Sequence, residues 1–143
     1  MLEEKQKKAI IIPCSGIGKA FGSVGREAAY IVTDELRPDH TGTVCLSLLT
    51  MGDEEARVLV QSSPTLTIDG CPKACARRNV EASGGTPAAE FRVVDVYRAN
   101  RELKVDSVLQ LGDNGRRLAR ILAEQVVAEV DRILAESEEV RHA

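Results

Sequence analysis

Four cysteines are the residues of this chain whose type and spacing could support chemistry. They are Cys14, Cys45, Cys71 and Cys75. A cysteine thiolate is both a nucleophile and a soft metal ligand, and four thiolates around one ion form a common kind of zinc site. Iron–sulfur clusters use the same ligands. The first eight residues are charged and lack the apolar stretch of a signal peptide, so we expect a reducing compartment, where disulfides are rare.

Two predicted strands lead directly to cysteines. The apolar run of residues 9–12 precedes Cys14, and the β-branched segment Thr65–Asp69 precedes Cys71. Both are typical of strands buried on two faces of a parallel sheet. Because parallel strands end at the same edge, these two cysteines should lie side by side if their strands are neighbours. We expect a helix to begin at Pro72, and the four-residue spacing would then place Cys71 and Cys75 on one helical face.

Cys45 lies within the second strand, which is predicted over residues 42–46. Each strand residue advances about 3.3 Å, so a strand that continued to Leu49 would leave Cys45 about 13 Å from the edge of the sheet. Cys45 can join the other cysteines only if that strand ends near Leu46.

The remaining segments alternate between strand and helix. Helices are predicted over residues 24–36 and 72–84, and a short helix is predicted after a cap at Asp53. A long final helix is predicted from Asp113 or Asn114 to about Leu134, and we expect it to fray from Glu136 onward. A fourth strand is predicted over residues 91–97. This alternation predicts an α/β fold of three layers with a parallel sheet of about four strands, flavodoxin-like or Rossmann-like. Ligands of such sheets bind outside the carboxyl ends of the strands.

Length and composition exclude several classes of protein. The chain has 143 residues, 19 basic and 22 acidic side chains, and a net charge of -3. We expect a single domain over residues 1–143, soluble and cytoplasmic, with no nucleic-acid or membrane partner, because both partners select dense basic or apolar segments. Aromatic residues make up 3% and tryptophan is absent, so few side chains could stack on a large organic cofactor.

Three readings of the cysteines remain open on these grounds. Metal or cluster binding is favoured, redox or nucleophilic thiol chemistry comes second, and cysteines that merely fill the core come third.

Other residues near the cysteines have simpler roles. Asp69, at the end of the third strand, could cap the following helix or hydrogen-bond a metal ligand, and capping is the simpler role. The pair Arg77 and Arg78 could bind an anion, although a solvated helix face is the default. The final helix should cover the core, with a homodimer surface as the lesser alternative.

The segments around the cysteines also resemble a known family. Residues 12–16 (Ile-Pro-Cys-Ser-Gly), 44–46 (Val-Cys-Leu) and 68–71 (Ile-Asp-Gly-Cys), followed by Cys75, are similar to the DGC-domain family of proposed zinc-binding proteins. That family is named for the Asp-Gly-Cys triplet, and the likeness extends over residues 10–82. The resemblance implies that Cys14, Cys45, Cys71 and Cys75 are the metal ligands. It implies no enzymatic reaction.

The expectation is therefore a non-catalytic protein that binds zinc through four thiolates at the carboxyl edge of a parallel sheet. The zinc would be structural if four ligands close the site, and serve metal delivery or sensing if a position stays open. The alternative is a redox protein with an iron–sulfur cluster or a reactive pair of cysteines.

Overall fold

A computed structural model of the chain describes residues 8–14, 19–105, 107 and 110–142, so the expectations about the first residues and about Ser15 and Gly16 lie outside it. The strands are β1 (Ala9–Pro13), β2 (Thr41–Thr43), β3 (Thr65–Asp69) and β4 (Ala89–Arg92). The helices are α1 (Ala20–Tyr30), the π-helix η1 (Ile31–Leu36), α2 (Leu46–Thr50), α3 (Glu54–Ser62), α4 (Cys75–Ala82), α5 (Val93–Ala99) and α6 (Asp113–His142).

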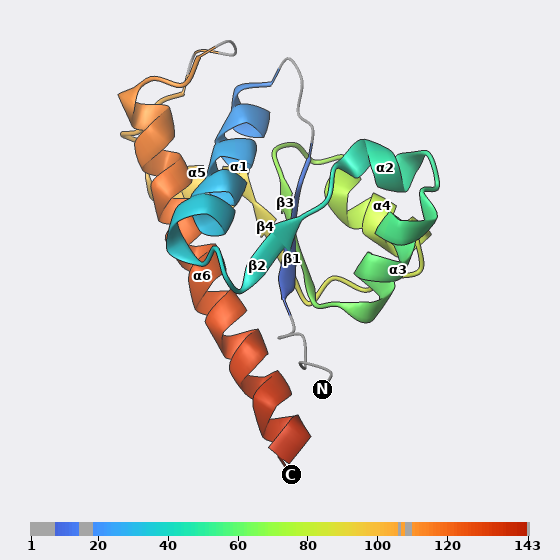
Figure 1. The fold of residues 1–143 in the computed structure, drawn as a ribbon. Helices are drawn as coiled ribbons and strands as arrows, with labels where there is room; N and C mark the ends of the chain where they lie inside the picture. The colour runs from blue at the N-terminus through green and yellow to red at the C-terminus, as the bar shows by residue number, and fades with distance from the viewer. Residues whose placement is uncertain (1–7, 15–18, 106, 108–109, 143) are drawn as a thin grey trace.

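The four strands form one parallel sheet in the order β2-β1-β3-β4. Helices α1, η1, α5 and α6 pack on one face, and α2, α3 and α4 cover the other (Figure 1). The predicted three-layer α/β fold is confirmed, and the strand order is that of flavodoxin-like sheets. β1 lies between β2 and β3, so the order reverses beside it, which is where such sheets bind ligands.

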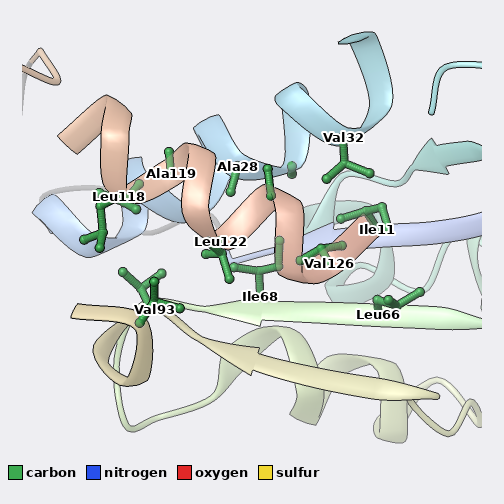
Figure 2. Close-up of a cluster of buried hydrophobic side chains, with 14 of the residues drawn as sticks. Ile11, Ala28, Val32, Leu66, Ile68, Val93, Leu118, Ala119, Leu122 and Val126 are labelled. Atoms are coloured by element: carbon green, nitrogen blue, oxygen red, sulfur yellow. The ribbon is translucent and has the colours of Figure 1, made fainter. Parts of the chain in front are cut away.

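Alternating residues of β3 face two different environments. Leu66 and Ile68 belong to the apolar cluster on the α6 side, which also contains side chains of α6 and η1 (Figure 2). Thr65, Thr67 and Asp69 have the opposite parity and therefore point to the α4 side. All five are buried.

The long helix α6 covers the core, as predicted. The side chains that it buries against the sheet and α1 are Leu118, Ala119, Leu122, Ala123, Val126 and Val130 (Figure 2). The helix continues to His142, beyond the end expected near Leu134. Arg132 pairs with Glu129 and Glu136 there, and such i,i+3 and i,i+4 pairs stabilise an exposed helix. Among the described residues, no helix is both long enough and apolar enough to cross a membrane.

The predicted fourth strand over residues 91–97 is partly wrong. β4 begins earlier, at Ala89, and ends at Arg92, which pairs with the last residue of β3, Asp69. β4 has no other neighbour in the sheet, so residues beyond this point have no ladder partner and their backbone groups are satisfied by helix α5 instead. Val93 and Val96, which suggested a strand, are buried in the core beside α6.

The predicted second strand is also too long. β2 pairs only with residues 9–11 of β1 and ends at Thr43. The chain then enters helix α2, which was not predicted although Leu46 and Leu49 have helical spacing and are buried. Gly52 follows the helix with a φ of 79°, a left-handed conformation suited to glycine after a helix end.

Candidate metal centre

The parallel sheet brings all four cysteines to one edge. Cys14 directly follows β1, Cys71 follows Gly70 at the end of β3, Cys45 precedes α2, and Cys75 is the first residue of α4. β1 and β3 are neighbours, so the expected placement of Cys14 and Cys71 after adjacent strands is confirmed. β2 ends before Cys45, which meets the condition for Cys45 to lie at the same edge.

Two of these cysteines are anchored in the apolar cluster on the α4 side. Cys14 is 9% exposed and belongs to that cluster, and Cys75 packs against it while partly buried. The backbone N–H of Cys14 donates to the carbonyl of Ile68 over 2.9 Å, which extends the β1–β3 ladder past the end of β1. The backbone position of Cys14 is therefore held by the sheet.

Cys45 is the exposed member of the group. It is the N-cap residue of α2, and its Sγ lies 2.9 Å from Oγ of Ser47. The hydrogen bond with Ser47 holds the pKa of the Cys45 thiol below its ordinary value, because it favours the thiolate. The contact between Ser47 and Cys45 was not predicted, although a hydroxyl in the first helical turn after a cysteine indicates that such a hydrogen bond can form.

The structure corrects the relation between Cys71 and Cys75. The expected helix from Pro72 begins only at Cys75, because Ala74 adopts a left-handed conformation with a φ of 52°. Cys71 lies in a turn outside the helix, where its carbonyl accepts from the N–H of Ala74 over 3.2 Å. The two cysteines therefore do not share a helical face.

Asp69 explains why α4 begins where it does. Its buried carboxylate accepts hydrogen bonds from the backbone N–H groups of Ala76 at 2.8 Å and Arg77 at 3.2 Å. These are N–H groups that a helix leaves unsatisfied at its start, and Ala74 has no side chain that could cap them. Burial raises the pKa of Asp69 above its ordinary value, and the two N–H groups oppose that rise. The capping role predicted for Asp69 is confirmed.

Gly70 is required by a close approach between β3 and α1. A Cβ atom at this position would lie 2.8 Å from the backbone nitrogen of Gly22 and 2.9 Å from the carbonyl carbon of Phe21. Any larger residue would push the start of α1 away from the end of β3. In the triplet Asp69-Gly70-Cys71, the aspartate thus caps α4, the glycine allows the close approach of α1, and the cysteine supplies a thiol.

The side chains do not form a closed metal site. Among the residues that the structure describes, no three cysteine, histidine, aspartate or glutamate side chains lie close enough together to hold a metal ion. All four cysteines belong to this described part, and none is joined in a disulfide. The chemistry of the four donors suits zinc. Their present arrangement gathers them at one edge without closing a coordination shell.

Two adjoining cavities open at the same edge, between the ends of β3 and β4. The first has a volume of about 260 Å³ and includes Cys71, Arg92 and Arg98 in its lining. The second has a volume of about 320 Å³ and includes Arg77 and Arg92. Arg92 and Arg98 are not among the residues predicted for the site, although two arginines near the end of a strand are a signal for an anion site.

Comparisons with known proteins support one assignment. The family model described as DGC domain matches residues 10–111, a segment that contains all four cysteines and the Asp69-Gly70-Cys71 triplet. No match is found among curated proteins or among solved structures. The matched segment spans most of the chain, which therefore belongs to the DGC-domain family.

Proposed function

We propose that this protein is a non-catalytic metal-binding protein, with zinc as the metal and Cys14, Cys45, Cys71 and Cys75 as its ligands. The observation that carries this proposal is the common placement of the four cysteines. Three neighbouring strands, β2, β1 and β3, each lead to one of them, and the fourth begins the helix that follows β3. Thiolates in this number suit zinc, which prefers sulfur and nitrogen ligands in tetrahedral sites.

The contact between α2 and α4 supports this proposal. Cys45 precedes α2, Cys75 begins α4, and the two helices pack against each other. The hydroxyl of Thr50 on α2 donates to Asn79 on α4 over 3.1 Å, and the Asn79 amide donates to the carbonyl of Cys75 over 2.8 Å. A hydrogen-bonded path therefore links the end of α2 to Cys75.

The charge of the site must be balanced by side chains. Four thiolates around a divalent ion carry a net charge of -2. Two N–H groups at the start of α4 are already used by Asp69, so they are not free to stabilise thiolates. Lys73 lies between Cys71 and Cys75 and is exposed, and Arg77 follows Cys75 on α4. These cations are the nearest in sequence that could offset the charge.

The arrangement favours an exchangeable site over a structural one. Both faces of the sheet have apolar clusters that are formed by the chain alone, so the fold does not depend on metal ligation for its core. Binding would require the thiols to draw together. A site of this kind suits metal delivery or sensing.

Metal analysis of purified protein tests the proposal. We expect about one zinc per chain and a colourless solution, and replacement of the exposed Cys45 in Cys45→Ser should lower the zinc content to less than half. Cys14→Ser should do the same, with circular dichroism to confirm that this buried substitution leaves the protein folded. Ser47→Ala is the matched control, because it removes the hydroxyl that contacts Cys45 and keeps all four thiols.

Other outcomes would point elsewhere. A brown protein that contains iron and sulfide after anaerobic purification would identify a cluster protein instead. Unchanged zinc content in both Cys→Ser variants would show that these residues are not ligands. A protein that binds no metal, and whose thiols oxidise in pairs, would favour the redox alternative.

A further inference from the structure

We infer that the cavity beside Cys71 binds a small organic anion, held by Arg92 and Arg98 at its charged side and by Phe21 at its apolar side. This inference is independent of whether the cysteines bind a metal, because it rests on groups outside the cysteine set.

The cavity combines two kinds of surface. Phe21, Pro72 and Val94 supply apolar lining, and Arg92 and Arg98 line the same cavity. Its volume of about 260 Å³ lies just below the range of about 300 to 1,000 Å³ that small-molecule sites occupy. It lies at the carboxyl edge of a parallel sheet, where ligands of α/β folds bind. Its size and lining therefore suit a compact molecule with an apolar body and one acidic group.

The arginines at this cavity have more positive charge than their ion-pair partner can neutralise. Asp95 accepts from Nε and Nη2 of Arg92 at 3.2 and 3.1 Å, and the same carboxylate is the partner of Arg98 at 3.8 Å. One carboxylate is thus shared by two guanidinium groups. Asp69 also lines the cavity and brings a negative charge to it, which the two N–H groups at the start of α4 help to offset. Donors of Arg98 therefore remain for a ligand.

Alkylation of the cysteines by two reagents of matched size tests the inference. Iodoacetate is an anion and iodoacetamide is neutral, and with either reagent the thiolate displaces iodide to form a thioether. The ratio of the two rates at each cysteine is measured by peptide mass spectrometry on protein kept metal-free with a chelator. Because both reagents attack the same thiolate, this ratio does not depend on the pKa of the thiol.

Cys45 serves as the internal control, since it is exposed and does not line this cavity. At low ionic strength we expect the iodoacetate-to-iodoacetamide ratio to be about fivefold higher at Cys71 than at Cys45, because two guanidinium groups raise the local concentration of the anion. Arg98→Gln and Arg92→Gln should each lower the ratio at Cys71 at least twofold. Benzoate should slow the alkylation of Cys71 by iodoacetamide, and benzamide should not.

Arg132→Gln is the matched control variant. Arg132 is paired with carboxylates and is 50% exposed, close to the 49% of Arg92, but it lies on α6 and not at this cavity. Its replacement should leave the ratio at Cys71 unchanged. Equal ratios at Cys71 and Cys45 in the unsubstituted protein would overturn the inference, as would a raised ratio that persists in both Arg98→Gln and Arg92→Gln. Because no metal is present, either result would leave the proposed metal binding untouched.

Discussion

The two faces of the sheet differ in how completely they bury apolar groups. On the α6 side, alternate residues of β1 and β3 meet a long helix and form a cluster made of aliphatic side chains (Figure 2). On the α4 side, three shorter helices cover a smaller cluster that includes Cys14, with buried polar groups of Thr65, Thr67 and Asp69 beneath them. The same strands thus supply a face that stabilises the fold and a face that carries polar groups and thiols.

This difference shows how one small sheet can hold both a core and a site. A strand alternates its side chains between the two faces, so Leu66 and Ile68 can be optimised for packing without changing Asp69. The α6 face also lies against a helix of 30 residues, whereas α2, α3 and α4 have 5, 9 and 8 residues. We therefore expect substitutions on the two faces to separate stability from ligand binding.

The largest effect should come from Leu122→Ala on α6. Leu122 is fully buried against the sheet, and removal of its side chain leaves a cavity, so the free energy of unfolding should fall by about 3 kcal/mol. Urea denaturation followed by circular dichroism measures this. The zinc content per folded chain should be unchanged, and a loss of zinc in folded Leu122→Ala protein would show that the two faces are coupled.

A smaller loss is expected for Asp69→Ala on the other face. The substitution leaves the N–H groups of Ala76 and Arg77 without their acceptor, which should lower the free energy of unfolding by about 2 kcal/mol. Asp69→Asn is the control, because an amide oxygen still accepts one hydrogen bond, and its cost should be below about 1 kcal/mol. Equal losses in both variants would mean that the charge of Asp69, rather than its capping oxygen, stabilises α4.

Thr67→Val should stabilise the protein. The hydroxyl of Thr67 is buried and has no hydrogen-bond partner among the described residues, so an isosteric methyl group should raise the free energy of unfolding by about 1 kcal/mol. Thr43→Val is the matched control on β2, where the hydroxyl donates to the carbonyl of Ile11 over 2.7 Å, and it should be neutral or destabilising. A destabilised Thr67→Val protein would indicate that a ligand or water satisfies this hydroxyl.

The smallest effect concerns the ion pair that joins the end of η1 to α6. Arg37 donates from Nε and Nη2 to Asp131 at 2.9 and 2.8 Å, and this hydrogen bonding lowers the pKa of Asp131 below its ordinary value of 3.8. Both groups are more than a third exposed, so after solvent screening the pair should contribute at most about 0.5 kcal/mol.

The pH dependence of this ion pair has a definite sign. A lowered folded-state pKa contributes stability that is present above the ordinary pKa of 3.8 and is lost as the pH falls through the lowered value. Arg37→Gln should therefore differ from the unsubstituted protein in thermal stability at pH 6 and converge with it in strong acid. A difference that persists in strong acid would assign the effect of Arg37 to packing instead.

Local patterns in the sequence determined much of this fold. Continuous β-branched runs placed β1 and β3, because such runs satisfy strands that are buried on both faces. Asp53 marks the start of α3, where its carboxylate accepts from the N–H of Ala56, and the apolar spacing of α6 identified its buried face. The types of the four cysteines and the Asp69-Gly70-Cys71 triplet likewise belong to the sequence, and they pointed to the DGC-domain family.

Only the tertiary structure decided the outline of the candidate site. Val93 and Val96 have strand propensity, but they form a helix because β3 ends at Asp69 and offers no further ladder partner. α4 begins at Cys75 because the carboxylate of Asp69 reaches its first free N–H groups, a contact over seven residues that propensity does not encode. The placement of Arg92 and Arg98 beside the cavity of Cys71 has the same cause. Hydrogen bonding between distant segments, and not the local sequence pattern, determines where β3 and β4 end.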